Sequence, residues 1–482
     1  MISKLTSIFK KALPKNAFAR GVSVLVGGTV GAQALMVLAS PLLTRLYTPE
    51  DFGLLAVYAS ILSLFTVIAS LRYELAIPLP EKDSEAAHVA ILSLLIVGLI
   101  TAISALVILI GGERLAQLIN APDMANYLWL IPVGVLAIGC YQVFNYWAIR
   151  TKSFGTIAKT KISQSLATLA VQLSGFKLGV LALMLGQTGG QAVGVMTLAR
   201  PALKSPHFKG WHWRDLKKVA ARYKRFPIFS TWEGFLNTAS MQLPPLLFAI
   251  FFSAGVAGLY ALAHRVLAMP MSLVGSAVGN VFFANAAEAY REDRLAPLFE
   301  SVYAKLVSII MPVMLVLMID APRLFAFVFG ANWEEAGELA RWMAPWLAVV
   351  FIASPLSTMF TILEKQKQGM CFQGLILSVR VLAIGIGFQY DSMILTVILF
   401  SLFSMLCWIG FLIWVAGHAK SQLHHLAKPL LKSLALAVIC TLPLLITTVF
   451  ELPALYWYAA LLVTGLMSAL YYFFVFKKSF AQ

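Results

Sequence analysis

The stretch GLYALAHRVLAMPMSLVGSAVGNVFFA, from Gly258 to Ala284, is apolar enough to cross a bilayer, yet it carries the guanidinium of Arg265 near its middle. A charged side chain at the centre of a membrane helix costs at least about 2.5 kcal/mol on insertion scales, so it persists where it faces protein or water. The stretch therefore predicts a membrane-spanning segment that borders a polar cavity.

The rest of the chain repeats this apolar pattern. Its 482 residues are 60% hydrophobic and only 12% charged, whereas a soluble domain carries roughly twice that charged fraction. Runs of about 20 apolar residues recur about fourteen times, and the connections between them are too short for a separate soluble domain. The sequence therefore predicts an all-α polytopic membrane protein.

The net charge of +16 follows membrane topology. With the N-terminus assigned to the cytoplasm, roughly thirty Lys and Arg fall in inner segments and roughly five in outer ones. We therefore expect no nucleic-acid partner, and we expect both termini in the cytoplasm. The four cysteines form no CxxC pair, so we expect neither a disulfide nor a metal site.

A basic linker divides the chain into two halves. We expect a basic amphipathic segment over 1–20, a first lobe of about six spans over 21–199, the cytoplasmic linker over 200–226, a second lobe of about six spans over 227–416, and about two further spans with a cytoplasmic C-terminus over 417–482.

The two halves align weakly with each other. The overlay places Phe52-Gly53-Leu54 on Ala257-Gly258-Leu259. Because both halves begin on the cytoplasmic side, they would be parallel repeats related by an axis along the membrane normal. The overlay also places Arg265 on Ser60, so this cation belongs to the second half only.

The ionisable residues within spans all lie in the second half: Glu233, His264, Arg265 and Arg380. Arg265 and Arg380 are candidate substrate ligands, because a long side chain near mid-span cannot easily reach the membrane surface. Alternatively, Arg265 forms a structural ion pair with Glu233. Glu233 is either a carboxylate that couples transport to a proton or sodium gradient, or a surface carboxylate paired with nearby Arg and Lys. His264 we expect to be a packed, neutral side chain.

Neutral polar side chains could complete a cavity. Such groups either bridge helices or line water, and together with Arg265 they could bind the phosphates and sugars of a ligand. Prolines inside spans, Pro270 among them, either kink helices beside the cavity or shape packing. The cavity candidates are Gln33, Asn145, Asn237 and Gln242.

Motifs for enzymatic chemistry are absent from the sequence. It contains no HExxH and no glycine-rich phosphate loop before a Lys-Ser/Thr pair, and no acidic cluster faces the outside. We therefore expect a transporter that is not an enzyme and that needs no cofactor.

Two segments, LLTRLYTPEDFGLLAVYASI from Leu42 to Ile61 and LRYELAIPLP from Leu71 to Pro80, resemble the opening of the Wzx-type polysaccharide flippases. These proteins belong to the multidrug/oligosaccharidyl-lipid/polysaccharide exporter superfamily. In addition, the spacing of Tyr260, Ala263, Arg265 and Pro270 resembles span eight of that superfamily's lipid II flippases, in which the arginine lines a central cavity.

The resemblance implies a V-shaped pair of lobes that alternates between inward-facing and outward-facing states in the bacterial inner membrane. The ligand would be an oligosaccharide on undecaprenyl pyrophosphate, flipped to the periplasmic leaflet for O-antigen, capsule or exopolysaccharide synthesis. Membrane lipids would surround the protein, and a polymerase and a chain-length regulator of the same pathway would be further partners.

One departure from the lipid II flippases concerns the first lobe. Those proteins carry several arginines there, whereas Arg45 and Arg72 of this chain lie near the ends of spans. Two rival functions also remain open at this point. One is a cation-coupled multidrug antiporter of the same superfamily, and the other is a membrane glycan polymerase.

Overall fold

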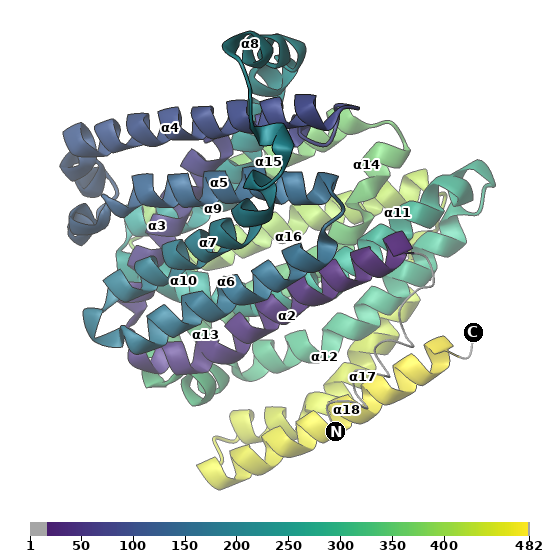
Figure 1. The fold of residues 1–482 in the computed structure, drawn as a ribbon. Coiled ribbons are helices and arrows are strands. Elements are labelled where there is room, and N and C mark those ends of the chain that lie inside the picture. The colour runs from purple at the N-terminus through teal and green to yellow at the C-terminus, as the bar shows by residue number, and fades with distance from the viewer. Residues whose placement is uncertain (1–16, 481–482) are drawn as a thin grey trace, which may run out of the picture. The chain divides into compact units, whose positions relative to one another are not determined.

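A computed structural model describes residues 17–480 of the chain. The described residues form helices joined by short turns, and none of them belongs to a β-strand (Figure 1). The predicted all-α fold is confirmed. Most of the amphipathic segment predicted over 1–20 lies outside the described residues.

The chain divides into two compact units, Met1–Gly258 and Leu259–Gln482. The predicted lobe boundaries rest on the apolar spans and the basic linker between them, and they stay a prediction. In the first unit α9 packs against α3. The helices of this unit are α2 (Ala17–Leu46), α3 (Pro49–Ile68), η1 (Tyr73–Ala76), α4 (Asp83–Leu118), η2 (Pro122–Tyr127), α5 (Leu130–Arg150), α6 (Phe154–Ser174), η3 (Phe176–Leu178), α7 (Val180–Leu203), η4 (Pro206–Phe208), α8 (Trp213–Arg222), η5 (Phe226–Ser230) and α9 (Thr231–Phe251).

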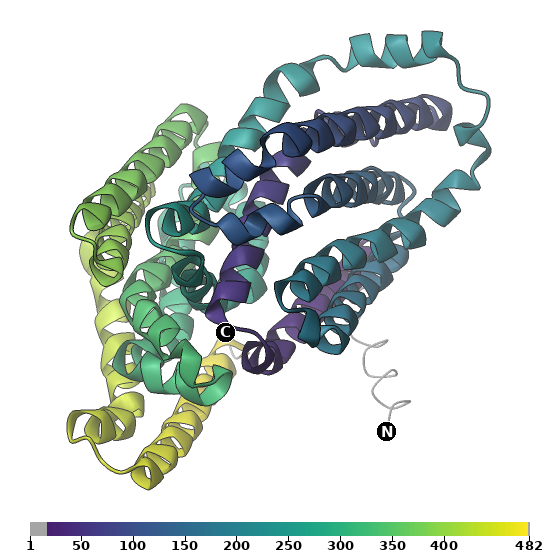
Figure 2. The ribbon, with the colours of Figure 1, turned by 90° about the vertical axis from the view of Figure 1, so that its left-hand side faces the viewer.

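The second unit begins within α10. Its last helix, α18, turns back along α17, and α17 packs against α12 (Figure 2). The remaining helices are α10 (Ala254–Leu267), η6 (Met271–Gly275), α11 (Ser276–Arg291), α12 (Leu295–Phe329), η7 (Ala331–Trp333), α13 (Glu334–Ala353), η8 (Ser354–Thr358), α14 (Met359–Ile362), α15 (Gln366–Gln389), α16 (Met393–His418), α17 (Leu423–Val449) and α18 (Ala454–Phe480).

Ten segments of the described chain are helical, long and apolar enough to cross a membrane. They include α2 to α5, α12 and the α13–α14 segment, and α15 to α18. The other predicted spans fall on α6, α7, α9 and the α10–α11 region. These segments are more polar or are interrupted by breaks in the helix. The helix α6, for example, contains Lys159 and Lys161. The predicted number of fourteen spans stays a prediction.

The stretch from Gly258 to Ala284 is not one continuous α-helix, and the break falls at Pro270, one of the prolines named as a possible kink. The first helix, α10, ends at Leu267, and η6, a π-helical turn, precedes α11. Pro270 explains the break, because proline lacks an N–H and its ring clashes with the carbonyl four residues earlier, at Val266. Arg265 therefore lies in the last turn of α10.

The beginning of α10 crosses α3 at two glycines that the half-chain overlay equates. A Cβ atom on Gly53 would lie 1.6 Å from the carbonyl oxygen of Ala254, and one on Gly258 would lie 2.0 Å from that of Pro49. The same overlay equates Pro49 with Ala254. The contacts are therefore reciprocal, as a local two-fold axis requires, and they support the predicted repeat.

Candidate functional site

Arg380 of α15 lies between two aromatic rings of neighbouring helices. The centre of its guanidinium is 5.3 Å from the ring centroids of both Trp346 and Phe400. These rings meet edge to face at 5.2 Å, and Phe400 also packs edge to face on Tyr260. Aromatic faces attract a cation, so this cluster fixes the position of Arg380 and replaces part of the hydration that its charge loses.

The guanidinium of Arg380 has unused hydrogen-bonding capacity. Its Nε donates to Ser404 Oγ at 3.3 Å. Its two terminal nitrogens donate to no described residue, and no carboxylate of the described chain lies within 4.0 Å. Arg380 is thus a fixed, partly buried cation whose fork is available to an anion.

Arg265 is also partly buried. Within its own unit it forms no hydrogen bond and no ion pair with any described residue. The alternative ion pair with Glu233 would join the two units, and it stays a prediction. His264 packs against Tyr260 and Trp346 at ring distances of 5.8 and 6.2 Å, as expected for a packed histidine.

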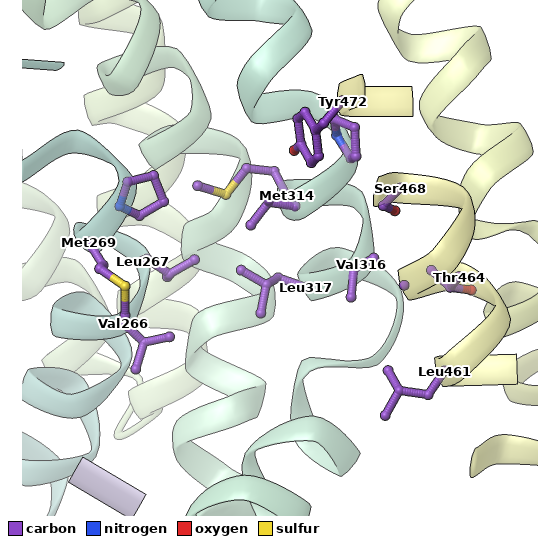
Figure 3. A pocket seen from close by; sticks show the side chains of 14 residues that line it. Val266, Leu267, Met269, Met314, Val316, Leu317, Leu461, Thr464, Ser468 and Tyr472 are labelled. Atoms are coloured by element: carbon purple, nitrogen blue, oxygen red, sulfur yellow. The ribbon is translucent and has the colours of Figure 1, made fainter. Parts of the chain in front are cut away.

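An apolar pocket of about 380 Å³ is lined by residues that follow Arg265 in the chain. Val266 and Met269 line it from the end of α10 and the break that follows, Leu317 from α12, and Thr464 from α18 (Figure 3). The lining contains no charged side chain. The pocket can therefore hold a hydrocarbon chain, and its first lining residue directly follows a cation.

The other predicted site residues are dispersed. Gln33, Asn237 and Glu233 are exposed. The amide of Gln242 donates to Ser63 Oγ at 2.9 Å, so this side chain bridges α9 and α3. Asn145 has a buried Oδ1 without a hydrogen-bond partner in the described chain. Their assignment to a cavity stays a prediction.

The turn between α3 and α4 contains a charged pair, a buried Glu74 and a half-buried Arg72, that was not among the predicted site residues. Glu74 is 2% exposed, and its Oε1 lies 3.9 Å from Arg72 Nη1. The hydroxyl of Ser70 donates to Glu74 Oε2. Burial raises the pKa of the Glu74 carboxyl, although Ser70 and Arg72 act in the opposite direction. An acid and a base two positions apart, within an otherwise apolar segment, could have indicated this pair.

Known proteins resemble this chain along most of its length. Residues 42–338 match the family model described as "Polysaccharide biosynthesis protein". The chain belongs to this family. The predicted resemblance to Wzx-type polysaccharide exporters is thereby confirmed at the level of the family.

Two relatives of this chain have names that describe a role. The chain is 24% identical over 355 residues to the succinoglycan biosynthesis transport protein ExoT of Rhizobium meliloti (strain 1021), covering 73% of this chain and 69% of ExoT. It is 26% identical over 299 residues to the lipopolysaccharide biosynthesis protein WzxC of Escherichia coli (strain K12), covering 61% of this chain and 59% of WzxC.

Solved structures show the same fold at low sequence identity. The inward closed lipid II flippase MurJ superimposes with a TM-score of 0.71 at 11% identity, over 96% of this chain and 99% of MurJ. An inward-facing multidrug resistance MATE transporter of the MOP superfamily gives 0.65 at 14% identity, over 82% of this chain and 96% of that structure. The chain is a multi-pass membrane protein with the MurJ/MATE fold.

Arg150 holds the loop of the LRYELAIPLP motif, Leu71 to Pro80, in place. Its Nη1 donates to the carbonyl oxygen of Pro80 at 2.7 Å, and its Nε donates to Asp83 Oδ1 at 2.9 Å. Backbone carbonyl groups of a loop have no partner within a helix, so they need donors such as this guanidinium. The motif therefore builds an ordered turn, and that turn carries Glu74 and Arg72.

Proposed function

We propose that the chain translocates an undecaprenyl-pyrophosphate-linked oligosaccharide from the cytoplasmic to the periplasmic leaflet of the bacterial inner membrane. The observation that carries this proposal is the lack of an acidic partner for Arg265 and Arg380 among the described residues of their unit. An unpaired, partly buried cation is costly. A diphosphate would compensate it, because guanidinium forks match phosphate oxygens.

The apolar pocket supports a lipid attached to that diphosphate. Val266, which follows Arg265 in the chain, lines the pocket, and the lining side chains are apolar apart from the hydroxyls of Thr464, Ser468 and Tyr472. A polyprenyl diphosphate joins the two complementary groups, an anionic diphosphate for the cation and a hydrocarbon chain for the apolar pocket. A segment of its hydrocarbon chain would occupy the pocket while the head group meets the cation.

Family membership and the relatives support a glycan as the third part of the ligand. ExoT is named for succinoglycan transport and WzxC for lipopolysaccharide biosynthesis. The Oδ1 of Asn145 has no hydrogen-bond partner in the described chain, and an amide oxygen of this kind can accept a hydrogen bond from a sugar hydroxyl. Capsule, exopolysaccharide and O-antigen repeat units are all consistent with this chemistry.

A multidrug antiporter fits the second unit less well. Two unpaired guanidinium groups would repel a cationic drug, since a like charge in a poorly hydrated site is unfavourable. A glycan polymerase would need catalytic groups. ExoT is named as a transport protein and WzxC as a lipopolysaccharide biosynthesis protein, and the two similar solved structures are a flippase and a transporter. Transport is therefore the function we propose.

The test is a translocation assay in vesicles that contain the purified protein and lipid-linked oligosaccharide. Arg265→Ala and Arg380→Ala should each lower the initial rate about 10- to 100-fold, because a charge-assisted hydrogen bond contributes about 1.5–3 kcal/mol. Arg214 is an exposed arginine on α8, so Arg214→Ala is the matched control and should keep the wild-type rate. A wild-type rate in the Arg265→Ala/Arg380→Ala double variant would refute the site.

The setting of this activity is part of the proposal. Both termini would be cytoplasmic, as the distribution of Lys and Arg predicts. A polymerase and a chain-length regulator would receive the translocated repeat unit on the periplasmic side. A proton or sodium gradient would drive the cycle, with no further cofactor.

A further inference from the structure

We infer that Glu74 is a proton-binding site of the first unit, and that the proton it takes up releases the guanidinium of Arg72. Glu74 Oε2 accepts the Ser70 hydroxyl, whereas Oε1 faces Arg72 Nη1 at 3.9 Å, beyond hydrogen-bonding distance. A proton from water would therefore bind Oε1. It converts the carboxylate into a neutral acid, and Arg72 keeps its own charge.

The surroundings of Glu74 favour the neutral form. Its side chain is 2% exposed and Ser70 is fully buried. The turn packs against α4, α5 and η5. Among the described charged groups of these elements and of the turn itself, Arg72 is the one that acts on Glu74, and it lowers the pKa of the carboxyl less than burial raises it. Tyr146 of α5 is the neighbouring titratable group that experiences both charges.

Arg72 is held in an unfavourable state by this pairing. Leu71 and Arg72 both adopt positive φ angles, 48° and 62°, which residues other than glycine rarely adopt. Arg72 donates no hydrogen bond within the described chain, and its Nε is buried without a partner. Strained conformations of this kind persist only while their surroundings enforce them. Loss of the negative charge on Glu74 removes part of that enforcement.

The charge change can reach the neighbouring helix α9 directly. The guanidinium of Arg72 packs on the backbone of α9 at Gly234, where a Cβ atom would lie 2.2 Å from Arg72 Nη2. A side chain at this position would displace the guanidinium of Arg72. A proton on Glu74 therefore alters a contact between the α3–α4 turn and the helix that leads into α10.

Glu233 provides the matched comparison. It was the carboxylate that the sequence placed inside a span, yet its side chain is exposed in the first turn of α9. It is next to Gly234 in the chain, and it lacks the burial of Glu74. Glu233→Gln therefore removes a carboxylate of the same unit that lacks the contacts of Glu74.

The first experiment is infrared pH-difference spectroscopy of the full-length protein in vesicles. We expect a carbonyl band of a protonated carboxylic acid that titrates with pH, is lost in Glu74→Gln and persists in Glu233→Gln. Ser70→Ala and Arg72→Gln keep the carboxyl but remove groups that lower its pKa, so each should move the titration to higher pH. Persistence of the band in Glu74→Gln, or no shift in the other two variants, would overturn the inference.

The second experiment links the proton to transport, and this arm rests on the proposed function. The translocation rate of lipid-linked oligosaccharide should depend on pH in the wild type and in Glu233→Gln, and the pH dependence should be lost in Glu74→Gln. An unchanged pH profile in Glu74→Gln would refute the coupling. If the wild-type protein moves no lipid-linked oligosaccharide at any pH, the proposed function fails, while the infrared titration still decides the proton site.

Discussion

The arginines of this protein differ mainly in what surrounds them. Arg380 lies between Trp346 and Phe400 with its terminal nitrogens unused, whereas Arg72 faces a buried carboxylate. Rings stabilise a cation without neutralising it. Arg380 can therefore attract an anion in its resting state. Arg72 becomes an uncompensated cation only after its acidic neighbour is protonated.

The raised pKa of Glu74 predicts how stability depends on pH. When folding raises the pKa of an acid, the folded state binds protons more tightly than the unfolded state does. Wild-type stability should therefore fall as pH rises from the usual glutamate range through the raised pKa of Glu74. In Glu74→Gln the side chain is neutral throughout, so this loss should be absent.

The measurement is the thermal unfolding midpoint of both proteins in the same detergent from acidic to neutral pH. The midpoint of Glu74→Gln relative to wild type should rise with pH. A relative midpoint that falls with pH would mean that the ionised carboxylate stabilises the fold, as a purely structural ion pair does.

Within the elements, the break after α10 shows what a sequence pattern can and cannot predict. Pro270 is visible in the sequence as a helix breaker, but its consequence, a π-helical turn at Met271–Gly275, depends on how the neighbouring helices satisfy the freed backbone groups. The same holds for Glu74, because its burial is created by helices distant in the sequence. Arg265 and Arg380 were predictable, since each interrupts an apolar run.

The crossing of α3 and α10 predicts opposite effects for the same substitution at different glycines. Gly53→Ala should destabilise the protein by about 1–3 kcal/mol, since overpacking a close contact costs that much, and a Cβ there would meet the carbonyl oxygen of Ala254. Gly258→Ala should have a similar effect, because the contact is reciprocal. The free energy of unfolding in detergent is the quantity to measure.

Gly98 of α4 is the matched control for these variants. A Cβ atom on it meets no other heavy atom within 4 Å. Gly98→Ala should therefore stabilise the protein by about 0.5–1 kcal/mol, the usual gain when alanine replaces glycine in a helix. If Gly53→Ala were as stable as Gly98→Ala, the close crossing would not exist in the folded protein.

For the whole molecule, composition predicted the class of protein, whereas the number of its spans stays a prediction. Long apolar runs predicted α4 and α12 directly, because runs of this length and hydrophobicity are suited to the hydrocarbon core of a membrane. Helices that face other helices need less hydrophobicity, and α6 and α7, on which two predicted spans fall, are not among the ten most apolar segments. Family membership agrees with the motif of Leu71 to Pro80, whose folded role, the turn bound by Arg150, was not predictable.

The topology of the whole chain is open to a direct test. Counting the ten apolar segments gives an even number, and adding α6, α7, α9 and the α10–α11 region keeps it even. We therefore expect both termini on one side of the membrane, and the basic linker and tail predict that this side is the cytoplasm. A fluorescent protein fused after Gln482 should fluoresce, and alkaline phosphatase fused there should be inactive. Alkaline phosphatase fused at Gly330, in the turn between α12 and α13, should be active. Active phosphatase after Gln482 would place the C-terminus in the periplasm and invert the proposed direction of transport relative to the structure.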